Sequence, residues 1–167
     1  LAVPAVEWLR VLRPHGGYLA ARDAGPFLDP ARGIPGEATG TGDHGLVFRF
    51  RRGAVPGEGQ WTHGYADAAN TACSGDALPF GEFEVLWFGR PGPQTMFERH
   101  VKAAPPLFQG GILYVTGRDY LAGMDAYNGA MLWEKEVRGS GRMAMLKDCG
   151  NMVASDGELF VAVDGAC

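Results

Sequence analysis

Two short patterns, Val85-Leu86-Trp87 and Gly111-Ile112-Leu113-Tyr114-Val115, each recur 46 residues later in the chain. The first returns as Met131-Leu132-Trp133 and the second as Gly157-Glu158-Leu159-Phe160-Val161. Two independent segments therefore share one offset. The sequence predicts a structural repeat with this period.

A period of about 40 to 50 residues is typical of the four-stranded blades of β-propellers, which bury their faces by stacking on one another. We therefore expect a mainly β fold: a partial β-propeller of about one and a half four-stranded antiparallel blades, with a short N-terminal α/β piece. Four blades need about 160 residues of repeat, and the repeat begins near residue 80 of 167. The chain is accordingly expected to be a fragment of a longer protein.

Apolar runs bounded by turn residues place the strands of this repeat. They are expected at residues 83–88, 105–109, 112–116, 120–126, 130–137, 152–155 and 159–163. Asn128-Gly129 predicts a type I′ hairpin turn, in which both residues take positive φ. The runs 112–115 and 159–163 are apolar without alternation, which predicts burial on both faces.

The N-terminal part follows a different pattern. Residues 5–12 have helical spacing, Pro14 and Gly16-Gly17 end the helix, and residues 18–21 form a short strand. Residues 46–51 predict one more strand, at a sheet edge, within a Gly/Pro-rich arm that spans residues 23–60. The expected domains are residues 1–55 and an incomplete propeller segment at residues 56–167.

The run Leu9-Arg10-Val11-Leu12-Arg13-Pro14-His15-Gly16-Gly17 resembles the late helix-turn-strand of class I S-adenosylmethionine-dependent methyltransferases. His15 departs from the family's wording, L-x-x-V-L-R-P-G-G. The glycine-rich loop with which that family binds its cofactor is absent from these residues. The resemblance therefore implies a methyltransferase-like remnant without catalysis, and a lone amphipathic helix with a Pro-Gly turn is the alternative.

Charge and cysteine content narrow the function classes. A net charge of −4 gives no electrostatic footprint for nucleic acid or anionic membranes, and no apolar run is long enough to span a bilayer. Cys73, Cys149 and Cys167 form no CxxC unit. Free thiols are favoured, and a Cys149–Cys167 disulfide remains the alternative.

The segment from Gly123 to Trp133 resembles the repeat of pyrroloquinoline quinone (PQQ)-type propellers, A-x-D-A-x-T-G-x-x-x-W. The residues that carry this structural motif are Gly123, Asp125, Asn128, Gly129 and Trp133, with Trp87 one repeat earlier. The resemblance implies that each tryptophan packs on the next blade while its indole N–H meets a backbone acceptor. It does not by itself imply PQQ, because the sequence has no vicinal cysteine pair and no dense set of calcium-binding oxygens.

The stretch from Gly59 to Thr71 is similar to the W-T-H…D-x-A-N-T signature that introduces the propeller in large bacterial proteins with a methyltransferase-like piece. Four residues are weak functional candidates: Trp61, His63, Asp67 and His100. Of these, His63, Asp67 and His100 could form a metal or acid/base site. The favoured alternative is that Trp61 and His63 anchor this loop on the first blade.

The sequence thus favours a non-catalytic bacterial scaffold for structure or protein interaction, in a periplasmic or other extracytoplasmic location. Its expected partners are the remaining blades of a longer chain and a protein partner, with no nucleic acid and no membrane span. No catalytic residue, metal ligand or cofactor is predicted, and cofactor-binding residues stay unassigned. The alternative is part of a PQQ-dependent oxidoreductase that uses calcium and acts on alcohols or sugars; a methyltransferase regulated by a propeller would require a glycine-rich loop upstream.

Overall fold

The computed structural model describes residues 3–23, 25–40, 48–77, 82, 84–90, 104–140 and 151–163. It is mainly β and divides into two compact units, Leu1–Gly57 (unit 1) and Glu58–Cys167 (unit 2). The division lies two residues from the boundary expected from the sequence. Among the described helices, none is long and apolar enough to cross a membrane.

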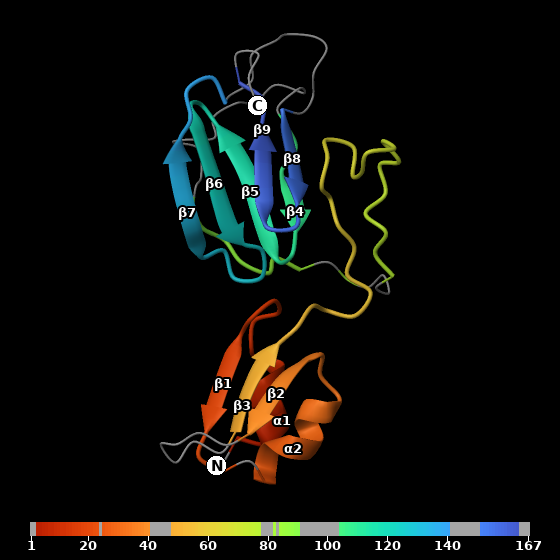
Figure 1. The fold of residues 1–167 in the computed structure, drawn as a ribbon, viewed down its shortest axis with the longest axis vertical. Helices are drawn as coiled ribbons and strands as arrows, with labels where there is room; N and C mark the ends of the chain where they lie inside the picture. Colours follow the sequence, from red (N-terminus) through yellow and green to blue (C-terminus); the bar gives the residue numbers. More distant parts are fainter. Residues whose placement is uncertain are drawn as a thin grey trace. The chain divides into compact units, whose positions relative to one another are not determined.

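Unit 1 contains two helices and one antiparallel sheet (Figure 1). In chain order the elements are α1 (Ala5–Arg10), β1 (Tyr18–Ala21), α2 (Gly25–Arg32), β2 (Gly36–Gly40) and β3 (Phe48–Arg52). The sheet order is β1-β3-β2. The expectation that β3 is an edge strand was therefore wrong, because β1 and β2 pair on its two sides.

The irregular arm expected at residues 23–60 was also too broad. It contains α2 and β2, and Pro30 lies inside α2. Pro30 is the sixth of the eight residues of α2, beyond the first turn, so its missing N–H removes one hydrogen bond from this short helix. β2 is a strand because it pairs with β3. Its small residues have no apolar alternation that would predict a strand from the sequence.

The core of unit 1 lies between the sheet and its helices. Phe48 and Phe50 alternate with exposed arginines on β3 and pack with Leu9 of α1 and Ala31 of α2. The rings of Phe27 and Phe48 stack at a centroid distance of 5.5 Å. Alternation on β3 thus sets one buried face and one exposed face.

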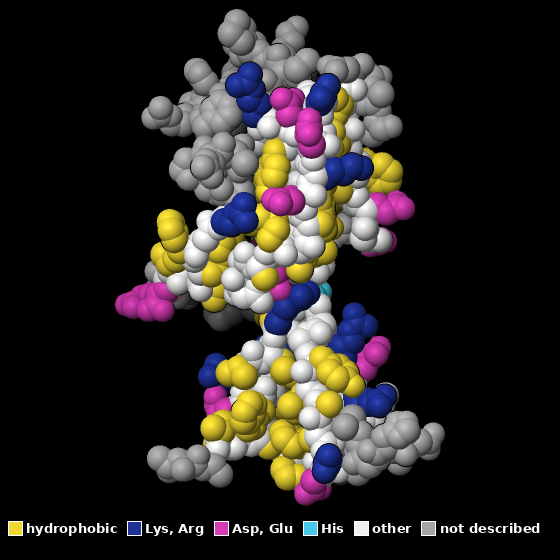
Figure 2. Space-filling model, turned by 90° about the vertical axis from the view of Figure 1, so that its left-hand side faces the viewer, with side chains coloured by type: hydrophobic (Ala, Val, Ile, Leu, Met, Phe, Trp, Pro, Cys, Tyr) yellow, Lys and Arg dark blue, Asp and Glu magenta, His cyan; other side chains and the backbone are white. Residues whose placement is uncertain are grey.

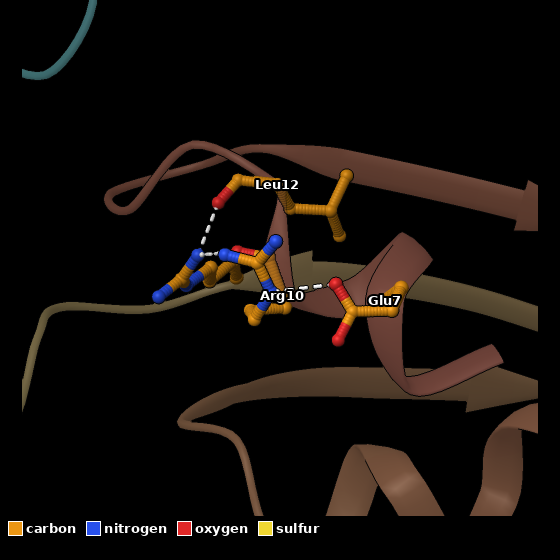
Figure 3. Close-up of polar contacts among 4 residues, drawn as sticks. Glu7, Arg10 and Leu12 are labelled. Carbon is orange, nitrogen blue, oxygen red and sulfur yellow. Dashed lines mark hydrogen bonds and ion pairs between the residues drawn. The ribbon is translucent and has the colours of Figure 1, made fainter. Parts of the chain in front are cut away.

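Arg52 joins β3 to the C-terminal end of α1. Its Nη1 atom donates to the carbonyl of Arg10 at 2.7 Å and also to the carbonyl of Leu12 (Figure 3). The last carbonyl groups at the C-terminal end of a helix have no backbone N–H partners. A positive charge is favoured at this end of the helix. Arg52 therefore closes α1, while Glu7 forms a surface ion pair with Arg10 on the same helix.

We expect Arg52→Ala to lower the free energy of unfolding of unit 1 by about 1–2 kcal/mol, because two carbonyls lose a charged donor. Chemical denaturation followed by circular dichroism measures this loss. Arg49→Ala is the matched control, since Arg49 lies on the exposed face of the same strand. Equal stability of the two variants would contradict the capping role.

Unit 2 contains a four-stranded antiparallel sheet and a hairpin (Figure 1). The sheet has the order β4-β5-β6-β7, and β8 pairs with β9. The strands are β4 (Leu107–Gln109), β5 (Ile112–Gly117), β6 (Tyr120–Asp125), β7 (Met131–Glu136), β8 (Met152–Ser155) and β9 (Glu158–Val161). These six strands occupy six of the seven runs expected from the sequence in this unit.

The hairpins β4–β5 and β8–β9 have the same register at the predicted offset. Leu107 pairs with Tyr114 and Phe108 with Leu113, while Val153 pairs with Phe160 and Ala154 with Leu159. Each residue of the second hairpin lies 46 positions after its counterpart in the first. The repeat in the sequence is thus a repeat of strand pairing.

The two faces of the β4–β7 sheet carry different apolar clusters. One face, here the Tyr114 face, has Leu107, Tyr114 and Leu121 in contact with Met152 and Ala154 of β8. The other, here the Ala122 face, has Val115, Ala122 and Met124 packed with Trp87. Both faces of β5 and β6 are therefore covered, as the apolar run 112–115 predicted.

The strand expected at residues 83–88 was wrong where it is described: residues 84–89 contain no strand. Val85, Leu86 and Phe88 are 82%, 69% and 98% exposed. No described strand pairs with this segment, and a strand needs a hydrogen-bonding neighbour to form. An apolar pattern alone does not supply one.

Two smaller expectations also fail. Burial of β9 on both faces was wrong, because its residues alternate between exposed and half-buried. Gly129 takes a φ of +72°, but Asn128 is not among the residues with positive φ, so the turn is not type I′. Instead the Gly129 N–H donates to the Asp125 carbonyl, which gives a longer, four-residue loop. The side chain of Asn128 accepts from the N–H of Ala130 and holds this shape.

Candidate functional site

Residues 58–76, which include the unusual polar stretch from Gly59 to Thr71, form a closed loop that we call the WTH loop. Its two ends are joined by backbone and side-chain hydrogen bonds: Gln60 N–H donates to the Ser74 carbonyl at 2.8 Å, and Gly59 N–H donates to Asp76 at 2.7 Å. A Cβ atom at Gly59 would lie 2.2 Å from the Ser74 oxygen. The close approach of the two ends therefore requires glycine at this position.

Trp61 attaches the WTH loop to the edge of the β4–β7 sheet. It forms an antiparallel bridge with Phe108 of β4, through N–H to carbonyl contacts of 2.9 and 2.8 Å. Its side chain packs on the apolar cluster of the Tyr114 face. Trp61 is thus held by both its backbone and its ring.

Thr62 extends this attachment to the second hairpin. Its carbonyl accepts the N–H of Ala154 in β8 at 2.9 Å. Ala154 lies 46 residues after Phe108 and has the same place in its hairpin. The dipeptide Trp61-Thr62 therefore contacts equivalent positions of two successive repeats.

His63 is half-buried and interacts within the loop. Its Nδ1 atom lies 2.8 Å from the Thr62 hydroxyl oxygen, and its backbone pairs with that of Ala66. The same hydroxyl lies 3.3 Å from the Ala66 carbonyl. The imidazole and the hydroxyl thus reinforce a tight turn between residues 62 and 66.

Asp67 organises the tip of the loop. Its Oδ1 atom accepts the N–H groups of Ala69 and Thr71, and its Oδ2 atom accepts the Thr71 hydroxyl at 2.6 Å. The hydroxyl of Thr71 is the main cause of a pKa below the ordinary value for Asp67, followed by the Thr71 N–H. Charge on His63 lowers this pKa further but ranks last among the causes. The carboxylate therefore stays ionised and is used as an acceptor by its own loop.

The backbone around Asp67 is strained. Ala66, Asn70 and Ala72 have positive φ values of 73°, 57° and 54°. An alanine in this region costs about 1–2 kcal/mol. The hydrogen bonds to Asp67 offset that cost and keep the loop in one shape.

The structure therefore brings three of the four candidates, Trp61, His63 and Asp67, into one loop, and His100 lies outside the described residues. Within the described part of the chain, no group of three or more His, Cys, Asp or Glu residues could hold a metal ion. Trp61 contacts the sheet, whereas His63 and Asp67 serve the internal hydrogen bonds of the loop. Trp61 therefore anchors the loop on the sheet, as the favoured alternative expected, whereas the described contacts of His63 lie within the loop.

Sequence reasoning missed four residues on which the loop depends: Gly59, Thr62, Thr71 and Asp76. Thr71 follows Asp67 at a spacing that suits a local side-chain turn, and this signal could have been read. The pairing of Gly59 with Asp76 joins positions far apart in sequence, so no local pattern indicates it. Cys73 is exposed and free, while Cys149 and Cys167 lie outside the described residues.

The repeat motif of β6 and β7 builds a second constellation, centred on Gly123. Gly123 pairs with Trp133, and a Cβ atom at Gly123 would lie 2.3 Å from the indole nitrogen. The Trp133 ring also lies 6.2 Å from that of Tyr114. Asp125 is 1% exposed, and its Oδ1 atom accepts the N–H of Tyr127 at the hairpin turn. The described contacts of these residues are packing and hydrogen bonds within the sheet and its hairpin turn.

Trp87 packs on the opposite face of the same sheet. Its indole N–H donates to the Ala126 carbonyl at 2.8 Å, and its ring lies where a Cβ atom of Gly129 would be, 2.4 Å from the nearest ring atom. Trp87 contacts the cluster of the Ala122 face, while Trp133 pairs with Gly123 and contacts Tyr114 on the other face. Two tryptophans one repeat apart thus cover opposite faces of one sheet.

Comparisons of the chain with protein-family models, with curated proteins and with solved structures found no match.

The lowered pKa of Asp67 gives a pH prediction. A carboxyl group whose pKa is depressed in the folded state stabilises that state above its unfolded pKa, and this contribution is lost as the pH falls below about 4. We expect Thr71→Val to return the Asp67 pKa toward its ordinary value, because the largest cause is removed. Carboxyl-detected NMR titration measures the shift. Thr39→Val, in unit 1, is the control; an unchanged Asp67 pKa in Thr71→Val would contradict the assignment.

Proposed function

We propose that unit 2 is a segment of a bacterial PQQ-like β-propeller protein that serves as a non-catalytic scaffold for structure or protein interaction. Its first partners would be further blades of a longer chain. A periplasmic or other extracytoplasmic location belongs to the same proposal. The proposal rests on how the sheet is built and on what each face presents.

One observation carries the proposal: the β4–β5 hairpin recurs as β8–β9 with the same register 46 residues later. A repeat of pairing, and not only of sequence, is what stacked blades require. The second hairpin packs its Met152 and Ala154 against the Tyr114 face of the first sheet. The second hairpin therefore helps to bury one face of the first sheet.

The two tryptophans support the same proposal. Trp133, on strand β7, lies over Gly123 on the Tyr114 face. Trp87, which precedes the sheet in the chain, packs on the Ala122 face. In the PQQ-type repeat that this segment resembles, the tryptophan is expected to pack on the neighbouring blade. The geometry gives both residues packing partners, which favours a structural role over cofactor stacking.

The scaffold proposal also accounts for the WTH loop. Trp61-Thr62 pairs with Phe108 and Ala154, the equivalent residues of two repeats, so the loop fixes one repeat relative to the next. It covers part of the β4 edge, which would otherwise present free backbone groups to other chains. His63 and Asp67 hold the loop in shape and need no substrate to explain them.

We expect the chain by itself to bind a hydrophobic dye and to self-associate, because Val85, Leu86 and Phe88 are mostly exposed beside the anchored Trp87. The double variant Val85→Ser/Phe88→Ser should lower both signals, measured by dye fluorescence and sedimentation velocity. Val11→Ser, which removes an exposed apolar residue of unit 1, is the control. A monodisperse monomer that ignores the dye and melts cooperatively would count against the proposal.

A PQQ-dependent oxidoreductase of alcohols or sugars remains the competing proposal. A calcium–quinone site is not fitted by the described residues, because they offer no cluster of metal-binding side chains. The carboxylates of Asp67, Asp76 and Asp125 are engaged by N–H and hydroxyl groups of their own loops. Saturable, calcium-dependent binding of PQQ in a calorimetric titration would replace the scaffold proposal with this one.

A further inference from the structure

The three-stranded sheet of unit 1 has one face that is exposed, which we call the arginine face. Leu19, Ala21, Phe48 and Phe50 point toward the helices and form the core. The residues that alternate with them are exposed: Tyr18 and Ala20 on β1, and Arg49 and Arg51 on β3. The arginines therefore lie on the central strand of the face, because the sheet order is β1-β3-β2.

The register defines the neighbours of each arginine. Arg51 lies between Tyr18 and Glu37, and Arg49 lies between Ala20 and Thr39. Within the described part of the chain, neither guanidinium forms a hydrogen bond or ion pair. The third arginine of β3, Arg52, points the other way and is used by α1. Two cationic groups thus remain available on an open surface.

The charge of unit 1 differs in sign from that of the chain. Leu1–Gly57 contains seven arginines, no lysine and five carboxylates, whereas the chain as a whole has a net charge of −4. Unit 1 is therefore basic, although the net charge of the whole chain is negative. Figure 2 shows that apolar side chains also remain on the surface of this unit, with basic side chains near its margins. An excess of basic groups attracts an anionic partner.

We propose that the arginine face binds an extended acidic peptide of a protein partner. Alternate side chains of a β-strand are about 7 Å apart, and an extended peptide has the same spacing, so carboxylates at positions i and i+2 match Arg49 and Arg51. Arginine binds carboxylates through paired hydrogen bonds, a geometry that lysine lacks. Tyr18, 55% exposed and opposite Arg51, offers an aromatic surface for an apolar residue of the peptide.

Glu37 sets a limit on this surface. It is exposed and lies opposite Arg51 on β2, so its carboxylate repels an acidic peptide at that position. Arg49 has the neutral Thr39 in the corresponding place. The stronger contact is therefore expected at Arg49. Removing the charge of Glu37 should strengthen binding about two- to threefold, the size of one exposed charge contact.

The experiment uses the full chain and a fluorescein-labelled peptide, Gly-Glu-Val-Glu-Val-Glu-Gly, with fluorescence anisotropy at low and physiological salt. We expect saturable binding that weakens with salt, and a loss of about tenfold in affinity in Arg49→Gln/Arg51→Gln. Arg32→Gln is the control, because Arg32 is an exposed arginine on α2 with only a surface ion pair to Asp29. It should bind like the unchanged chain, and Glu37→Gln should bind more tightly.

Three results would overturn the proposal. The first is equal affinity for a peptide with glutamine in place of each glutamate. The second is unchanged affinity in Arg49→Gln/Arg51→Gln or weaker affinity in Glu37→Gln. The third is tighter binding of an oligothymidylate of the same length than of the acidic peptide, which would assign the face to single-stranded nucleic acid instead. Because the substituted residues are exposed, the variants are expected to stay folded, which circular dichroism checks. The inference goes beyond the scaffold proposal and does not depend on it.

Discussion

Replacing Gly123 by alanine is expected to lower the free energy of unfolding of unit 2 by about 2 kcal/mol. The added Cβ atom would lie 2.3 Å from the Trp133 indole nitrogen and 2.5 Å from the adjacent ring carbon. The indole packs over β6 beside Tyr114 but is 36% exposed, so a shift toward solvent relieves part of the clash and loses part of this packing. Urea denaturation followed by tryptophan fluorescence measures the loss.

The chain supplies a matched control for this experiment. Gly89→Ala adds the same atom where no other atom lies within 4 Å, and it should leave stability nearly unchanged. Trp133→Leu removes the obstructing ring, so Gly123→Ala should cost less in that background than in the unchanged chain. A Gly123→Ala variant as stable as Gly89→Ala would show that Trp133 does not pack where the structure places it.

The second large effect is expected for Trp61→Ala, with a loss of about 2–3 kcal/mol, at the lower end for truncation of a large aromatic because Trp61 is only half-buried. The variant removes a ring from the cluster of Leu107, Tyr114 and Met152. It should also loosen the contact of Thr62 with Ala154. Hydrogen exchange at the amides of Phe108 and Ala154 reports this loosening, because both donate to the WTH loop.

Tyr65→Ala is the control for Trp61→Ala. Tyr65 belongs to the same loop but is 52% exposed, so its truncation should change stability far less. Trp61→Phe should retain most of the packing and the slow exchange at Phe108. If Trp61→Ala left both stability and exchange unchanged, the anchoring role would be lost, and Trp61 would become available for a binding function.

The sequence predicted the local hairpins of unit 2 because turn glycines and apolar runs act over a few residues. Gly110 and Gly111 take positive φ and join β4 to β5, between two of the expected strands. The prediction of a type I′ turn at Asn128-Gly129 was wrong, because hydrogen bonds to the Asp125 carbonyl and the Asn128 side chain favour a longer turn. Competing side-chain hydrogen bonds of this kind are not visible in a dipeptide signal.

The candidate site was predicted only in part. The sequence singled out Trp61, His63 and Asp67 as unusual, but it did not indicate that Thr71 holds the Asp67 carboxylate or that Trp61 bridges Phe108. The first contact is local and follows from known turn chemistry. The second joins residues 47 positions apart and depends on where β4 lies.

By itself, the sequence determined the 46-residue period, most strands of the repeat and the glycines that their turns require. Only the tertiary structure decided that Trp87 and Trp133 cover opposite faces, that β3 is central, and that residues 84–89 form no strand. The reason is physical: periodicity and backbone preference act between near neighbours. The partner of a strand edge, and the face that a side chain covers, are set by segments far away in the chain.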